Sequence, residues 1–183
     1  MHDAPQHYTA TAKWLHWLMA GIWISAWLLG FSAVHWRAIN EDHQITFWHK
    51  AIASTLLFLI VLRVAWRLTH PAPALPGNLS PLMRKAAHHG HMVLYAVALL
   101  ALPISGWLWS SVVGRPIMVL GLFQLPPLTG EHSGVAPYIK LFHTYVAWAC
   151  GALVVGHGLI ALKHHFIDRD AVLKGMLPGR RQA

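Results

Sequence analysis

Charged residues are scarce in this chain. Only 11% of its 183 residues are Asp, Glu, Lys or Arg, while 56% are hydrophobic; soluble domains usually carry roughly 25% charged residues. This shortage excludes an ordinary water-soluble domain and places the chain among membrane proteins. The excess of basic over acidic residues does not indicate nucleic-acid binding, because most basic residues stand at the ends of apolar runs, where lipid headgroups attract cations.

Cysteine is nearly absent. The single Cys150 stands within an apolar stretch, so an internal disulfide is excluded. The features of a signal peptide are missing as well, since residues 1–13 are polar and the apolar run that follows is too long and has no small-residue cleavage site. We therefore expect that run to remain in the protein as a helix.

Apolar runs of membrane-spanning length are present instead. A membrane helix needs roughly 20 apolar residues to cross about 30 Å of hydrocarbon. We predict membrane helices at about residues 14–34, 47–68, 91–113 and 141–162. The sequence thus predicts an all-α, integral membrane four-helix bundle, and we expect residues 1–183 to form a single domain.

The connections between these helices differ in character. Residues 69–81 contain four prolines and are expected to form an extended loop. Residues 116–127 are apolar but too short to span a membrane and end in two prolines, so we expect them to lie along the membrane surface.

Loop charges predict the orientation, because cytoplasmic loops carry an excess of Lys and Arg. The second loop with its flanks and the segment after the last helix hold Arg63, Arg67, Arg84, Lys85, Lys163, Arg169, Lys174, Arg180 and Arg181. The other two loops carry nearly balanced charges. We therefore expect both termini on the cytoplasmic side.

Histidine is abundant, with fifteen residues, and several stand inside the predicted spans. An ionisable side chain within a membrane is costly and indicates a function by default. His143 and His157 are fourteen residues apart on one helix, so they fall within about 40° of the same face and roughly 21 Å apart along the axis. The fourth helix therefore presents one histidine near each membrane surface.

Topology supplies a partner for each of these two residues. The first helix starts inside, which places His16 at the level of His157, and the second starts outside, which places His49 at the level of His143. Each pair can provide two axial imidazoles to one haem iron, and such an iron has no open site, which favours electron transfer over oxygen binding. No C-x-x-C-H sequence is present for covalent attachment. We therefore expect two haems b.

Structural roles are the alternative to ligation. A lone membrane histidine is more often a hydrogen-bonded contact between helices, but the paired arrangement across three helices favours iron ligation. His91 is expected to hydrogen-bond a haem propionate rather than to be axial. Small residues that would let a flat macrocycle approach the backbone, or serve ordinary helix packing, are Gly21, Gly30, Ala51, Ala53, Gly106, Gly151, Gly156 and Gly158.

Several short motifs together resemble the bacterial cytochrome b561 family, in particular its small four-helix di-haem members of the superoxide oxidase type. They are W-L-H-W at 14–17, W-H-K at 48–50, R-x-x-x-R at 63–67 with H-P-A-P at 70–73, A-H-H-G-H at 87–91, A-L-P-I-S-G at 101–106, and H-x13-H at 143–157 with K-H-H-F at 163–166. The resemblance covers nearly the whole chain. It implies that His16 and His157 bind the inner haem iron and that His49 and His143 bind the outer one.

The resemblance also implies a function. Members of this type lie in the bacterial inner membrane, oxidise superoxide to oxygen on the periplasmic side and pass the electron to ubiquinone near the inner haem, here around Pro81 and His164. Superoxide would be attracted by cations, and we expect Lys50, Arg115 and Lys140 to provide this steering, an effect that salt weakens. Anchoring at the membrane surface is the alternative role for these three residues.

Two other functions use the same histidines. An electron-transfer subunit would link the quinone pool to a partner dehydrogenase or hydrogenase, but the short outer loops offer little surface for a soluble protein, so such a partner is not required. A histidine-lined metal transporter is disfavoured, because ion pathways usually use carboxylates and no acidic residue falls within a predicted span.

Overall fold

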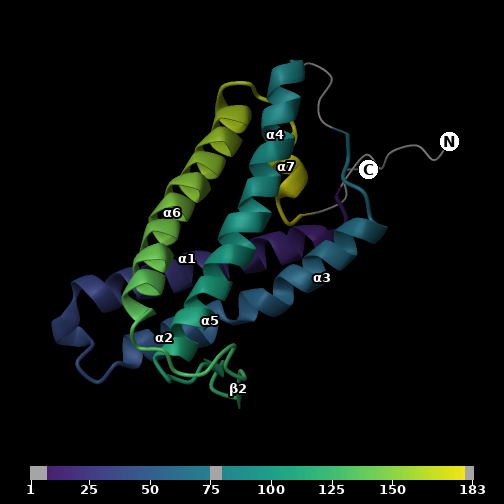
Figure 1. Cartoon of the computed structure of the whole chain (residues 1–183). Helices are drawn as coiled ribbons and strands as arrows, with labels where there is room; N and C mark the ends of the chain where they lie inside the picture. Colours follow the sequence, from purple (N-terminus) through teal and green to yellow (C-terminus); the bar gives the residue numbers. More distant parts are fainter. Residues whose placement is uncertain (1–7, 75–79, 180–183) are drawn as a thin grey trace.

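The computed structural model describes residues 8–74 and 80–179 and is built almost entirely of helices (Figure 1). The helices are α1 (Ala10–His35), α2 (Gln44–Ala53), α3 (Thr55–Thr69), α4 (Pro81–Val93), the π-helical segment η2 (Leu94–Ala101), α5 (Leu102–Val112), α6 (Ala136–Phe166) and α7 (Val172–Met176). A 3-10 turn, η1 (Arg37–Ile39), and two short strands, β1 (Met118–Val119) and β2 (Phe123–Gln124), complete the described residues. Pro76, Arg180 and Arg181, which entered the predictions for the second loop and the orientation, lie outside them.

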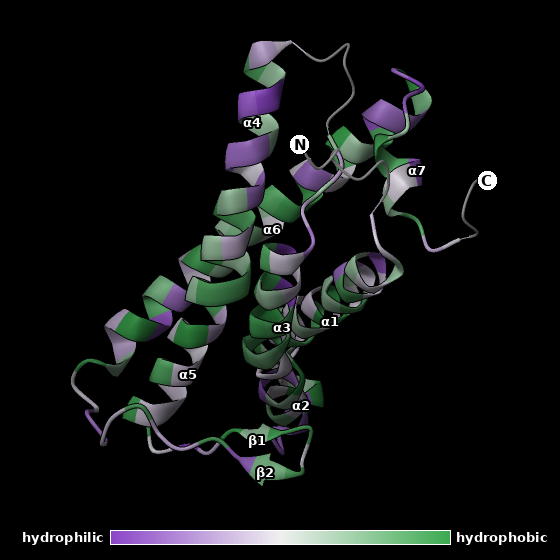
Figure 2. Cartoon of the chain, turned by 90° about the vertical axis from the view of Figure 1, so that its right-hand side faces the viewer, coloured by the Kyte–Doolittle hydropathy of each residue, from purple (hydrophilic) through white to green (hydrophobic). Residues whose placement is uncertain are grey.

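Four helical stretches of the described chain are long and apolar enough to cross a membrane: Ala10–His35, Gln44–Thr69, Pro81–Val112 and Ala136–Phe166. Only 6% to 22% of the residues in their most apolar windows are buried inside the protein. Hydrophobic residues, green in Figure 2, run along these helices, and many of their large side chains are exposed and therefore need lipid around them. This confirms the predicted all-α membrane bundle.

The helices extend beyond the predicted spans because polar caps and polar turns continue them. Thr9 caps α1 by accepting a hydrogen bond from the Ala12 N–H at 3.2 Å. Ser80 accepts one from the Met83 N–H at 3.3 Å, and Pro81 occupies the first turn of α4, where its missing N–H costs nothing. The third span therefore starts ten residues before the predicted position 91, and Pro81 belongs to this helix rather than to the preceding loop.

The bundle consists of two helical hairpins that cross at an angle (Figure 1). In one, α1 packs along α2 and α3; in the other, η2 and α5 pack along α6. Buried residues from both hairpins meet in one apolar core, among them Met19, Trp23, Leu56 and Cys150. The two halves of the molecule thus share a single interior.

A tryptophan joins the two hairpins within this core. In η2 the N–H of residue i+5 donates to the carbonyl oxygen of residue i, as the Leu102 N–H does to Val97 O. Continuing that pattern would require an N–H at residue 103, which is proline and has none. The Trp23 indole N–H instead donates to Ala98 O at 3.1 Å. Because no water is available in the membrane interior, a side chain of α1 supplies the hydrogen bond that this carbonyl needs.

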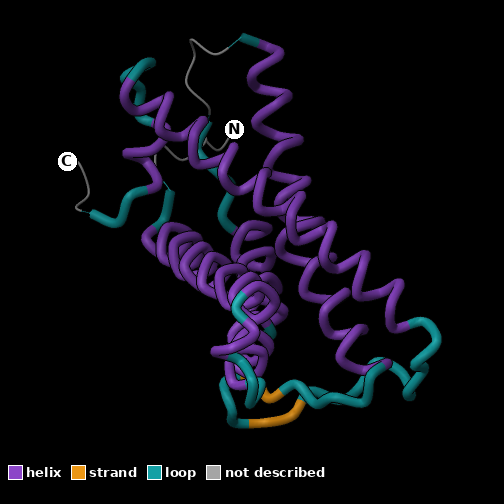
Figure 3. Tube along the Cα trace, turned by 90° about the vertical axis from the view of Figure 1, so that its left-hand side faces the viewer, coloured by secondary structure: helices purple, strands orange, loops and turns teal. Residues whose placement is uncertain are grey.

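The apolar segment between α5 and α6 forms a small β-hairpin at one end of the bundle (Figure 3). Ile117, Val119 and Leu125 form a second apolar cluster against Leu57 and Trp107. The Leu120 N–H donates to Ala51 O at 3.2 Å, which ties the turn to the end of α2. The sequence did not predict these strands, because each contains only two residues.

Candidate functional site

One pair of histidines lies toward the end of the bundle that carries the β-hairpin. The ring centroids of His49, on α2, and His143, on α6, are 6.3 Å apart. His49 Nδ1 is 2.7 Å from Ala26 O, and because a carbonyl only accepts, Nδ1 carries the proton. His143 Nδ1 is 2.8 Å from the Ser105 Oγ, whose own hydroxyl donates to Leu102 O. In both neutral rings Nε2 is therefore left with a lone pair that can bind a metal.

Two glycines make room for these rings. A Cβ added at Gly30 of α1 would lie 2.9 Å from His49 Cε1, and one added at Gly106 of α5 would lie 3.0 Å from His143 Cε1. Each imidazole thus packs directly against the backbone of a neighbouring helix, and the close approach of His49 and His143 depends on the missing side chains.

The second pair lies toward the other end of the bundle. His16, on α1, and His157, on α6, have ring centroids 6.2 Å apart. His91 of α4 is nearer to His157, at 5.4 Å, and its Nδ1 donates to Ala87 O at 2.7 Å. Arg63 Nη2 lies 3.3 Å from His16 Nδ1.

The separations in the two predicted pairs fit a shared metal. An imidazole nitrogen binds a metal at about 2 Å and the ring centre lies about 1 Å behind it, so two axial rings on opposite sides of one ion have centroids about 6 Å apart. The values of 6.3 Å and 6.2 Å agree with this requirement. The 5.4 Å between His91 and His157 is shorter than it, which disfavours His91 as an axial ligand.

The family model for prokaryotic cytochrome b561 matches residues 7–179. The chain belongs to this family. It is 38% identical over 176 residues to cytochrome b561 homolog 2 of Escherichia coli K12, covering 96% of this chain and 93% of the relative. It is 28% identical over 178 residues to the probable superoxide oxidase CybB of Yersinia pestis, covering 95% and 97%, and 26% identical over 182 residues to cytochrome b561 homolog 1 of E. coli K12, covering 95% and 98%.

Membership in the cytochrome b561 family establishes a bacterial membrane cytochrome that transfers electrons and binds haem b. The residues described above fit that cofactor, since the paired imidazoles have a suitable separation and the two glycines leave their rings clear of side chains. The identity of the ligands and the number of haems stay predictions.

A spacing of fourteen residues recurs in all four membrane helices of this cytochrome b561. The pairs are His16 and Gly30, His49 and Arg63, His91 and Ser105, and His143 and His157. In a regular helix this spacing is close to four turns, about 21 Å, so both members share a face. In the third helix the π-helical segment intervenes, yet His91 still contacts His157 and Ser105 still contacts His143. The interior thus has two levels, each contacted by every helix.

Arg63 was missed as a site residue from the sequence, where it was assigned to the membrane surface. Its side chain instead turns inward, with Nε donating to the Tyr95 hydroxyl at 2.6 Å and Nη2 near His16. The signal was present, because Arg63 follows His49 at the same interval that separates His143 from His157. Ser105 follows His91 at that interval and was also missed.

The three cations expected to attract superoxide do not share one environment. Lys50 Nζ donates to Pro116 O at 2.6 Å and to the Ser110 Oγ at 3.3 Å, so it anchors the loop that carries the exposed Arg115. Lys140 is an exposed residue near the start of α6. The structure thus brings Lys50 close to the Arg115 loop, beside His49, and records no contact of the Lys140 side chain with either among the described residues.

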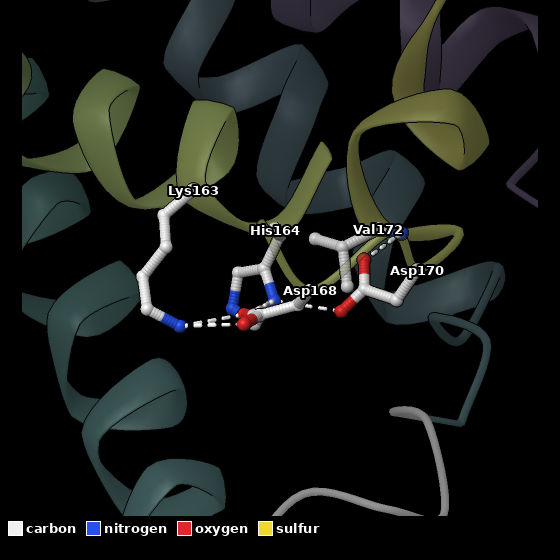
Figure 4. Close-up of polar contacts among 5 residues, drawn as sticks. All are labelled: Lys163, His164, Asp168, Asp170 and Val172. Carbon is white, nitrogen blue, oxygen red and sulfur yellow. Dashed lines mark hydrogen bonds and ion pairs between the residues drawn. The ribbon is translucent and has the colours of Figure 1, made fainter. Parts of the chain in front are cut away.

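His164, expected near ubiquinone, lies in a polar cluster at the other end of α6 (Figure 4). Its Nδ1 is 2.6 Å from an Asp170 carboxylate oxygen and 3.2 Å from one of Asp168, while Lys163 pairs with Asp168 at 2.7 Å. The three residues His164, Asp168 and Asp170 are close enough to hold a metal ion, but Lys163 and the Val172 N–H already engage the carboxylates. Pro81 is exposed at the start of α4.

We expect Gly30→Ala to lower the haem content of the purified cytochrome. The new Cβ would lie 2.9 Å from His49 Cε1, so the ring must move away from its position opposite His143. Haem per chain, measured by the pyridine haemochrome assay, should fall. Gly21→Ala is the matched control, because it lies on the other face of the same helix and a Cβ there meets no atom within 4 Å. Equal haem content in the two variants would show that the close approach at Gly30 is dispensable.

Proposed function

We propose that this cytochrome b561 holds two haems b, one between His49 and His143 and one between His16 and His157, and moves electrons from superoxide to ubiquinone. The observation that carries the proposal is the pair of imidazole separations, 6.3 Å and 6.2 Å, at two levels of one bundle. His143 and His157 are separated by roughly 21 Å along α6, so the two levels together extend over most of the hydrocarbon thickness.

The overall reaction balances with one quinone and two superoxide ions. Each superoxide loses one electron and leaves as dioxygen, and ubiquinone gains two electrons and two protons to become ubiquinol. Haem iron, when bound, accepts and releases one electron at a time. With both axial positions taken by imidazoles, the iron has no position left for oxygen, and superoxide need only come close enough to transfer an electron.

Positive charge supports the outer site. Lys50 is adjacent in sequence to His49, and its contact with Pro116 O keeps the Arg115 segment close by. A local excess of cations raises the rate at which an anion arrives, and salt screens this effect. The 28% identity to a probable superoxide oxidase over nearly the whole chain favours the same substrate.

His164 supports the quinone site. Its Nδ1 proton is held by Asp170, and the side chains of the two residues are only 9% and 8% exposed. This carboxylate orients the ring through the Nδ1 proton, so that the imidazole can pass protons to a quinone oxygen. Since ubiquinone reduction takes up two protons, a histidine held in this way near the inner histidine pair supplies what the reaction needs.

The orientation of the protein in the membrane follows from the basic residues at one end of the bundle. The Trp17 indole donates to Met176 O at 2.9 Å, which places α7 beside the first turns of α1, at the end of the bundle where Arg63, Arg67, Lys163 and Lys174 also lie. Basic residues favour the cytoplasmic side. We therefore assign this end to the cytoplasmic face of the inner membrane and the β-hairpin to the periplasmic face.

The direct test is a stopped-flow assay with generated superoxide and a soluble ubiquinone analogue. Purified protein should oxidise superoxide much faster than uncatalysed dismutation, and only when quinone is present, with one ubiquinol formed for every two superoxide ions consumed. Raising the ionic strength should slow the reaction. A rate no better than dismutation, with two haems present, would favour the electron-transfer subunit instead.

The inner and outer pairs should be separable by substitution. His157→Ala is expected to remove the inner haem and abolish quinone reduction, while the outer haem remains reducible by superoxide. His143→Ala should remove the outer haem. Haem per chain and the low-temperature alpha-band spectrum, near 560 nm, distinguish the two. If His157→Ala abolished the component that superoxide reduces first, the assignment of the two levels would be inverted.

Asp170→Asn should slow quinone reduction by about tenfold or more, because a neutral amide binds and orients the His164 ring less strongly than a carboxylate does. Both haems should stay bound and superoxide should still reduce them. His164→Gln should have a similar effect, whereas Asp168→Asn, which replaces the more exposed and Lys163-paired carboxylate, should change the rate little. The measurement is ubiquinol formation under pre-reduced conditions. Unchanged rates in Asp170→Asn would remove His164 from the proton path.

A further inference from the structure

Arg63 is a charged residue of a membrane helix whose side chain turns toward the interior of the bundle. It lies in α3, six residues before the helix ends at Thr69. Nε donates to the Tyr95 hydroxyl at 2.6 Å, Nη2 lies 3.3 Å from His16 Nδ1, and the guanidinium carbon is 5.6 Å from the Tyr95 ring centroid. Nη1 is buried and has no hydrogen-bond partner among the described residues. One arm of the guanidinium therefore points into the interior with its donors unused.

Among the residues that the structure describes, no carboxylate forms an ion pair with Arg63. The six acidic residues, Asp3, Glu41, Asp42, Glu131, Asp168 and Asp170, all fall outside the four spans. A charged arginine at this depth is costly unless it is paired. The described part of the chain thus supplies no anion for Arg63, which points to a bound molecule as its source.

The contact with His16 itself points to that anion. An arginine only donates, so His16 Nδ1 accepts from Nη2, which requires the proton of the neutral ring to be on Nε2. When Nε2 binds a metal, Nδ1 carries the proton instead and can no longer accept. Occupation of the inner site thus forces Arg63 to find another acceptor close to His16.

We propose that Arg63, braced by Tyr95, binds a propionate carboxylate of the haem held between His16 and His157. The planar guanidinium matches a carboxylate with two parallel hydrogen bonds. Because the Tyr95 oxygen accepts from Arg63 Nε, its own proton is available for the same anion. This inference rests on the proposed inner haem.

Binding of the propionate by Arg63 has a consequence for electron flow. Reduction lowers the charge of the iron by one, and a fixed cation beside the haem stabilises the added electron, which raises the reduction potential. At the outer level Ala26 O and the Ser105 Oγ accept hydrogen bonds from the Nδ1–H groups of His49 and His143. These hydrogen bonds make the imidazoles more basic. More basic ligands favour the oxidised iron. Arg63 should therefore raise the reduction potential of the inner haem, which favours the arrival of electrons there.

The test uses purified, haem-loaded Arg63→Gln, Arg63→Lys and Arg67→Gln. Arg67 is the matched control, because it is exposed, lies one turn further along α3 and involves the same loss of charge. In a potentiometric titration, Arg63→Gln should lower the midpoint of the inner haem and leave the outer one unchanged. Arg63→Lys should recover part of the shift, and Arg67→Gln should show none. The inner component is identified as the one missing from His157→Ala.

A second arm separates the haem carboxylate from a lipid phosphate. Protein stripped of haem is reloaded with haem dimethyl ester, which lacks the negative charges. Wild type and Arg63→Gln should then have the same inner midpoint and lose haem to apomyoglobin at the same rate. A difference that persists with the ester would assign the anion to lipid and overturn the proposal.

The outcomes distinguish this inference from the function on which it rests. A wild-type protein with no haem between His16 and His157 would end the proposed function. If two haems are present and the inner haem of Arg63→Gln has the same midpoint potential as in wild type, only the proposed contact between Arg63 and the propionate is refuted. If Arg63→Gln failed to fold, the ester experiment on wild type and Arg63→Lys would decide, since removing the haem charges should lower haem retention in wild type more than in the lysine variant.

Discussion

The interior of this bundle is organised by two pairs of imidazoles that face each other across helices at the separation that one metal ion requires. The constraint is tight, because a metal–nitrogen bond tolerates little variation in length. Other features follow from it: Gly30 and Gly106 admit rings that a methyl group would displace, and Ser105 and Ala26 O hold the Nδ1 protons so that Nε2 is available. In this cytochrome of the b561 family the backbone, as well as the side chains, thus determines how the paired imidazoles are placed.

The two levels differ in the groups that contact the histidine Nδ1 atoms. Around His49 and His143 the nearest polar groups are neutral acceptors, while a guanidinium lies beside His16. Low dielectric strengthens such differences, since a fixed charge in the membrane interior is poorly screened. The ends of the bundle also carry different polar residues, with Lys50 and the Arg115 loop at one end and the His164–Asp170 pair at the other. The two proposed haem sites would therefore lie in different polar surroundings.

Much of the fold was predictable because membrane insertion depends on local hydropathy. Four spans of sufficient length were evident, and the helices continue past most of the predicted ends, among them the starts of α1 and α4, which Thr9 and Ser80 cap. The β-hairpin and the π-helical segment were not predictable. The strands depend on the packing of Ile117, Val119 and Leu125 against α3 and α5, and the π-helical segment depends on the Trp23 contact from another helix.

By itself, the sequence determined the four helices, the face shared by His143 and His157, and their pairing by depth with His16 and His49, because helical periodicity and membrane topology are set by residues close together in the chain. Only the tertiary structure decided that Gly30 receives His49, that Ser105 orients His143 and that Arg63 turns toward Tyr95 and His16. These contacts depend on the rotation and crossing of whole helices, which result from packing between residues far apart in sequence.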